Sequence, residues 1–121
     1  MIFHLSHCYT MKILHLTLKR KWFDLIASGK KTVEYREYKP YWEKRLVGKE
    51  FQEIHFRNGY SKNAPFMRVE CRGIVNVPET GGLLLKPEHG EELKGWQFAI
   101  LIGPVLEVKD NKPFQPTEKS G

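Results

Sequence analysis

Cysteine is scarce in this 121-residue chain, which contains only Cys8 and Cys71. Neither belongs to a closely spaced pair or to a His/Cys cluster of the kind that holds zinc, and the five histidines are scattered. We therefore expect no metal site, and nothing in the sequence calls for a cofactor. Two isolated cysteines are typical of a protein that works in a reducing, cytoplasmic setting.

Long apolar runs are also missing. No stretch is long enough to cross a membrane, and residues 1–10 lack the basic start and apolar core of a secretory signal. There is no internal repeat and no low-complexity segment. Because the regular pattern begins at Met11, we expect residues 1–10 to be an N-terminal extension, residues 11–109 to form one domain, and residues 110–121 to be a flexible tail.

Acidic residues are outnumbered, and the imbalance is local. The chain has 20 Lys and Arg against 14 Asp and Glu, which gives a net charge of +6. Residues 12–49 hold eleven cations against four acids, whereas residues 50–121 hold nine against ten. This cationic first third favours an anionic partner, with nucleic acid first. The alternative is the ordinary solubility charge of a small domain.

The hydrophobic pattern predicts five or six short strands and two short helices. Apolar residues alternate in most segments, while the helical segments repeat them every three or four residues. Together they predict an α+β domain, a small curled β-barrel of five to six strands with two short flanking helices. The expected strands are 12–18, 31–38, 51–57, 66–77 with a bend at Gly73, 96–102, and 105–108 after a break at Gly103-Pro104. The expected helices are 19–28, capped by Thr17, and 40–48.

The most informative stretch is residues 28–36, where the first helix stops at Gly29 and a strand begins. Two lysines occupy the turn, and alternation then places three polar residues on one strand face. A tight turn with an acid–base pair on one face is what a small binding or catalytic site needs. The alternative is a helix–strand connection whose charged strand is solvated. The residues concerned are Lys30 and Lys31 on the turn, and Thr32, Glu34 and Arg36 on the strand.

A second candidate is the turn Arg57-Asn58-Gly59-Tyr60. It brings together one cation, one amide and one aromatic ring, a combination that can contact a phosphate, a base edge or a base face. The alternative is an ordinary hairpin turn, because Asn-Gly favours such turns. Trp22 likewise has two interpretations, as a core residue or as an exposed platform for stacking.

The run from Leu16 to Arg36 resembles the signature of ASCH domains, the activating-signal-cointegrator homology domains related to the PUA domain. The family pattern is a helix ending in Ser/Ala-Gly, a basic residue, Lys-Thr, and an alternating strand that ends in Arg. Residues 56–60 resemble a subgroup of short bacterial and phage members. The resemblance covers residues 11–109 and is most specific over residues 28–36. It implies a PUA-like β-barrel with helices beside a cleft, and binding of RNA or nucleotides.

Some small bacterial ASCH proteins are amidohydrolases that deacetylate N4-acetylcytidine, and others have been described as ribonucleases. In the amidohydrolases a lysine of the Lys-Thr pair, a threonine further along the strand and a distant glutamate carry the reaction. Lys31 matches that lysine, whereas Glu34 occupies the threonine position. A carboxylate there implies a different mechanism, with a general base acting on water. The resemblance does not choose the distant glutamate among Glu79, Glu88, Glu91 and Glu92.

Three functions follow as hypotheses. The first is a module that binds RNA or a nucleotide-like ligand through Lys19, Trp22, Lys30, Lys31, Thr32, Arg36, Arg57, Asn58 and Tyr60. The second is a small hydrolase acting on a modified nucleoside or on RNA, with Lys31 and Glu34 as the reacting pair. The third is an accessory domain whose basic face contacts an acidic protein.

Overall fold

The computed structural model describes residues 10–77 and 87–110. It confirms the predicted α+β class: the described chain forms five strands that curl into a half-barrel and two short helices. In chain order the elements are β1 (Ile13–Thr17), α2 (Arg20–Ala27), β2 (Val33–Glu37), α3 (Pro40–Leu46), β3 (Glu53–Arg57), β4 (Phe66–Val77) and β5 (Gln97–Lys109).

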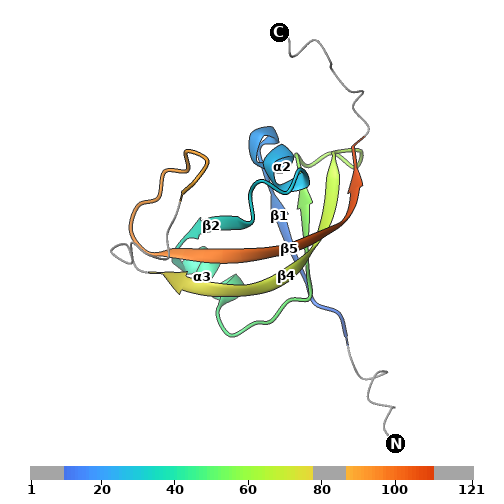
Figure 1. Ribbon diagram of the computed structural model, residues 1–121. Coiled ribbons are helices and arrows are strands. Elements are labelled where there is room, and N and C mark those ends of the chain that lie inside the picture. The colour runs from blue at the N-terminus through green and yellow to red at the C-terminus, as the bar shows by residue number, and fades with distance from the viewer. Residues whose placement is uncertain (1–9, 78–86, 111–121) are drawn as a thin grey trace, which may run out of the picture.

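The five strands form one mixed sheet in the order β1-β3-β4-β5-β2. β1 and β3 run parallel, and the other neighbours are antiparallel. The sheet curls through 211°, and the long strands β4 and β5 are bent along their length (Figure 1). Within the described residues, β1 and β2 are therefore edge strands that face each other across an open seam. The chain crosses this seam through α2, which follows β1 and precedes β2.

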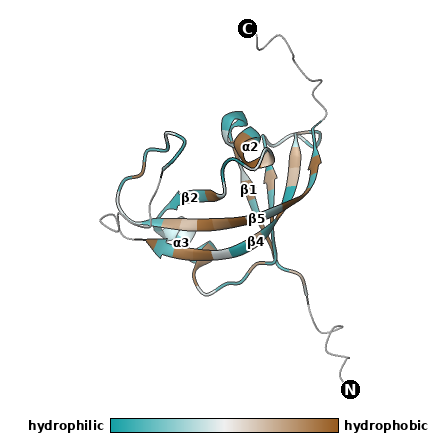
Figure 2. Ribbon diagram, viewed as in Figure 1, coloured by the Kyte–Doolittle hydropathy of each residue, from teal (hydrophilic) through white to brown (hydrophobic). Residues whose placement is uncertain are grey.

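The hydrophobic core fills the concave side of the half-barrel. Alternation placed Leu14, Leu16, Ile54 and Phe56 inward, and all four are buried there. Brown apolar segments recur along the strands and on α2 in Figure 2. Both helices contribute apolar side chains to this cluster, so they cover the interior that the curled sheet leaves exposed. The helical residues in the core are Phe23, Ile26 and Leu46.

The last strand differs from the prediction. The expected break at Gly103-Pro104 is absent, and β5 continues from Gln97 to Lys109. The register explains why, since Val69 pairs with Val105 and Cys71 with Ile102. Two residues of β5 thus stand opposite one residue of β4, and such a bulge accommodates a proline that cannot donate to the ladder. The predicted irregularity at Gly73 is confirmed by a register shift between Cys71 and Gly73.

The first helix begins later than expected and without the predicted cap. Its N-cap is Lys19, which makes no side-chain capping bond, and Thr17 is instead the last residue of β1. Its end agrees with the prediction, because Gly29 adopts φ +82°, a conformation that costs glycine little. Pro40 begins α3 as predicted, in the first turn, where no amide donor is required.

Several predictions concern residues outside the described part of the chain. They include almost all of the expected extension and tail, the cysteine at position 8, and Glu79. Among the described helices, α2 has eight residues and α3 has seven, so neither could traverse a bilayer.

Candidate binding and active site

A cleft of about 440 Å³ opens at the seam between the two edge strands. Its walls come from the end of β1, from α2, β2 and α3, and from the loop that precedes β5. Four cations and four carboxylates contribute to its lining, together with two tryptophans, Trp22 and Trp42. The charged lining residues are Lys19, Lys31, Arg36, Lys39, Glu34, Glu37, Glu91 and Glu92.

Lys31 reaches the cleft because of the way α2 ends. The backbone amides of Lys30 and Lys31 both donate to the carbonyl of Leu25, at 3.0 Å each, after the chain has turned at Gly29. The amine of Lys31 then lies 5.0 Å from the Trp22 ring centroid and 5.3 Å from that of Tyr35. Only 3% of the residue remains exposed, so its charge depends on partners within the protein.

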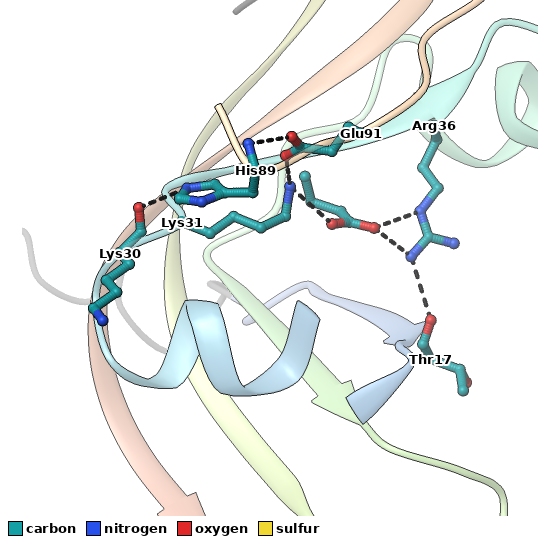
Figure 3. A network of polar contacts seen from close by, with 7 residues as sticks. Thr17, Lys30, Lys31, Arg36, His89 and Glu91 are labelled. Carbon is teal, nitrogen blue, oxygen red and sulfur yellow. Dashed lines mark hydrogen bonds and ion pairs between the residues drawn. The ribbon is translucent and has the colours of Figure 1, made fainter. Parts of the chain in front are cut away.

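Two carboxylates provide those partners. The amine of Lys31 lies 2.5 Å from Oε2 of Glu91 and 3.7 Å from Oε1 of Glu34. Figure 3 shows Glu91 approaching Lys31 from the loop before β5, on the side of the cleft opposite α2. Glu34 is itself 7% exposed, because its register partner Ile100 places it on the concave face. The interpretation of β2 as a solvated charged strand is therefore wrong at this residue.

Arg36 completes what we call the charged cluster, formed by Lys31, Glu34, Arg36 and Glu91. Its Nη2 and Nε donate to Oε2 of Glu34 at 2.8 and 3.2 Å. Nη2 also donates to the backbone carbonyl of Thr17 at 3.3 Å (Figure 3). Since Arg36 belongs to β2 and Thr17 to β1, one guanidinium bridges the two edges of the half-barrel. The same group lies 5.0 Å from the Trp42 ring centroid.

The two glutamates of the charged cluster differ in their electrostatics. Burial raises the pKa of Glu34 above its usual value of 4.5, although Arg36 and Lys31 act in the opposite direction. Burial alone would also raise the pKa of Glu91. Hydrogen bonds from Lys31 and from the backbone near His89 outweigh it, so that this pKa is lowered. Environments that push the pKa values of neighbouring groups apart are typical of acid–base sites.

His89 fixes the loop that carries Glu91. Its backbone amide donates to Oε1 of Glu91 at 2.8 Å, and its ring Nε2 lies 3.0 Å from the carbonyl of Lys30. A smaller depression of about 190 Å³ lies beside the cleft. Lys31, Tyr35 and Glu91 line both the cleft and this depression. The Lys31–Glu91 pair thus separates the cleft from the depression.

The structure brings together only some of the residues selected from the sequence. Lys19 and Trp22 line the cleft with Lys31, Glu34 and Arg36. Trp22 also packs partly against the core, which supports its interpretation as a core residue, whereas a stacking role stays a prediction. Thr32 is exposed and lines the smaller depression, while Lys30 is exposed and contributes its carbonyl to His89.

The turn at residues 57–60 lies outside the cleft lining. Arg57 lies on the convex side, 4.6 Å from the Phe66 ring centroid, and Tyr60 is 91% exposed. The amide of Asn58 donates to the carbonyl of Leu18 at 2.9 Å, and therefore supports the rim of the cleft from behind.

The residues that sequence reasoning missed are His89, Trp42 and the particular role of Glu91. Glu91 was one of four glutamates in the right region, but no local pattern set it apart. Trp42 lies in the aromatic segment after Pro40, which indicated a helix without indicating what it faces. These contacts join segments far apart in the sequence, and only the folded chain defines them.

Within residues 10–77 and 87–110, no group of three or more His, Cys, Asp or Glu side chains is arranged to hold a metal ion. Comparison with protein-family models, with curated proteins and with solved structures found no match for this chain. The findings establish a small α+β protein with a curled five-strand half-barrel.

Proposed function

We propose that this protein binds a nucleobase in the cleft, either as a nucleotide-like ligand or within RNA. The observation that carries the proposal is the charged cluster, in which cations and carboxylates alternate beside tryptophan rings. Donors next to acceptors match the edge of a base, and the rings offer faces for stacking. The cleft volume also falls within the range typical of small-ligand sites.

The charge balance favours a base over a phosphate in this cleft. Lys31 and Arg36 are each paired with a buried carboxylate, and the lining carries as many acids as cations. A phosphate would therefore meet little net positive charge here. The resemblance of residues 28–36 to ASCH domains gives independent support, since it implies a nucleotide-binding cleft beside two helices.

The test uses cytidine, uridine, adenosine and guanosine as probes, with binding followed by calorimetry at 50 and 500 mM salt. We expect at least one nucleoside to bind with an affinity that changes little with salt. Lys31→Met should weaken that binding at least tenfold, because it removes the centre of the charged cluster. Lys30→Met is the matched control, since Lys30 is an exposed neighbour outside the cleft lining, and it should bind normally. No binding at millimolar nucleoside would refute the proposal.

A second function, hydrolysis of an acylated nucleobase, is favoured by the contact between Lys31 and Glu91. In such a reaction water attacks the acyl carbon of N4-acetylcytidine, the C–N bond breaks, and the departing nitrogen takes a proton. Glu34 is suited to carry that proton because its pKa is raised by burial. The depression beyond the Lys31–Glu91 pair offers room for a short acyl group.

Chromatography of N4-acetylcytidine after incubation with the protein tests this second function. Release of cytidine and acetate should fall in Glu34→Gln and Glu91→Gln. It should persist in Glu92→Gln, which changes an exposed carboxylate of the same cleft. Absence of cytidine, or equal release by all variants, would exclude this hydrolysis.

A further inference from the structure

A second hollow lies outside the cleft, on the convex side of the half-barrel. We call it the basic depression, a hollow of about 490 Å³ lined by Arg57, Lys62, Asn63, Ala64, Phe66 and Lys109. It is formed by the ends of β3 and β5, the start of β4 and the loop that joins β3 to β4. Three of its six lining residues are cations, and none is a carboxylate. This composition contrasts with the balanced charge of the cleft.

The sheet register places the main residues of the basic depression in one row. Arg57 of β3 pairs with Phe66 of β4, which pairs with Lys109 of β5. Neighbouring strands lie about 4.8 Å apart, so the Arg57 and Lys109 backbones are separated by about 10 Å. A spread of this size suits successive phosphates of a strand better than a single bound anion.

Two cations of the basic depression, Arg57 and Lys109, are available to a partner. Within residues 10–77 and 87–110, Arg57 forms no ion pair, and its guanidinium lies over the Phe66 ring. In the same described part of the chain, Lys109 pairs with Glu107 at 3.5 Å, and an exposed pair at this distance is weak. Arg68, on the same face, is different, because Glu53 and Glu107 both accept hydrogen bonds from it. We therefore leave Arg68 out of the proposed contact.

Aromatic rings extend the basic depression across the convex face towards β1. The ring of His55 lies edge-on to Phe66 at 5.2 Å, and His15 lies edge-on to His55 at 5.4 Å. Burial, followed by the nearby His55 and Arg57, lowers the pKa of His15, which keeps its ring neutral near pH 7. Rings interleaved with cations are the usual components of a surface that binds single-stranded nucleic acid.

We infer that the basic depression, with the rings beside it, binds the phosphate backbone of a single-stranded RNA. The inference rests on the proposed function in one respect, since a base held in the cleft would belong to the same strand. The link is short: Thr17 is the register partner of Arg57, and Thr17 and Leu18 line the cleft. One edge of the half-barrel thus separates the two surfaces.

The experiment measures binding of a fluorescent ten-nucleotide oligouridylate by anisotropy at 50 to 250 mM salt. The test variant combines Arg57→Gln, Lys62→Gln and Lys109→Gln. The matched control combines Lys12→Gln, Lys44→Gln and Lys49→Gln, which removes the same charge at the opposite end of β3. Lys12 and Lys49 line another hollow there, so the control also tests that hollow as the RNA site. Circular dichroism melting checks that both variants fold.

We expect the test variant to bind at least tenfold more weakly than the wild-type protein at 100 mM salt. Its plot of log affinity against log salt should be shallower by about 2, because each lost phosphate contact removes about 0.7 from the slope for a single strand. The control should lose less than threefold. Equal losses in both variants would overturn the inference, as would unchanged binding in the test variant.

Competition separates the remaining sources of negative charge. The competitors are inorganic phosphate and a ten-residue glutamate peptide, each compared with unlabelled RNA. If phosphate displaces the labelled RNA as effectively as unlabelled RNA does, the surface is a simple anion site and the inference is overturned. If the peptide does so, the surface is a protein site and the inference is likewise overturned. Nucleoside binding distinguishes the two proposals, because the test variant should retain it. Loss of RNA binding with intact nucleoside binding supports the inference, whereas RNA binding without any nucleoside binding would refute the cleft proposal alone.

Discussion

The pairing of Lys31 with Glu91 makes a sharp prediction about stability. Lys31→Met keeps the length of the side chain and its packing against Trp22, but it leaves the carboxylate of Glu91 facing an apolar group. That carboxylate side chain is 10% exposed. Breaking a buried pair in this way costs about 3 kcal/mol. With a urea dependence of about 2 kcal/mol per molar, the midpoint should fall by about 1.5 M.

The partner variant and the double variant isolate the interaction itself. Glu91→Gln should cost about 2 kcal/mol, because the amine keeps Glu34 at 3.7 Å. The double variant removes both charges, and we expect a total loss of about 3 kcal/mol rather than the sum of the two single losses. The coupling free energy of Lys31 and Glu91 is then about 2 kcal/mol. Urea unfolding followed by circular dichroism measures all three values.

The pH dependence gives a second check on the same pair. The pKa of Glu91 is lowered in the folded protein. Its stabilisation is therefore complete above the ordinary glutamate value of 4.5 and disappears as the pH falls through the lowered pKa. The coupling should be full at pH 7 and should decline as the pH falls below 4.5 through the lowered pKa of Glu91. The pairing would be refuted if, at pH 7, the losses of stability in the two single variants sum to the loss in the double variant within about 0.5 kcal/mol.

Three further predictions concern neighbouring residues. Arg36→Lys keeps the charge but loses the planar guanidinium that joins Glu34 to the carbonyl of Thr17. Urea unfolding should show that the free energy of unfolding falls by about 1.5 kcal/mol. An unchanged midpoint would mean that the bridge from Arg36 to Thr17 does not stabilise the protein. Since burial raises the folded pKa of Glu34, stability should fall as the pH rises from 4.5 through that pKa. Glu34→Gln should lack this decline, and parallel pH profiles would contradict the assignment. Gly29→Ala should cost about 1 kcal/mol through its positive φ alone, since an added Cβ meets no atom within 4 Å. Thermal melting measures that loss, and a stabilised variant would rule it out.

Local signals were sufficient to predict most of the elements. Alternation of Leu14 and Leu16 identified β1 and its buried face, and Gly29 marked the end of α2. The bend at Gly73 followed from a glycine inside an apolar strand. Each of these signals acts within a few residues, which is the range over which a sequence pattern can be read directly.

What the sequence left open depends on register and on distant contacts. Pairing with Ile100 turns Glu34 toward the interior, and nothing within β2 itself specifies that partner. The bulges between β4 and β5 allow Pro104 to remain inside a continuous strand, contrary to the expected break. Glu91 meets Lys31 across 60 residues of sequence, so its selection among four glutamates required the fold.

The bridge from Arg36 to Thr17 has a consequence for how this protein can change. In a hydrogen-bonded ladder the distance between two strands is fixed at about 4.8 Å by the backbone, whatever the side chains are. Across the seam between β1 and β2, that distance depends instead on the length and shape of side chains such as Arg36. Substitutions at a few positions can therefore widen or narrow the mouth of the cleft while the sheet keeps its pairing. Ligand size can then vary among proteins with this arrangement without any rebuilding of the strands.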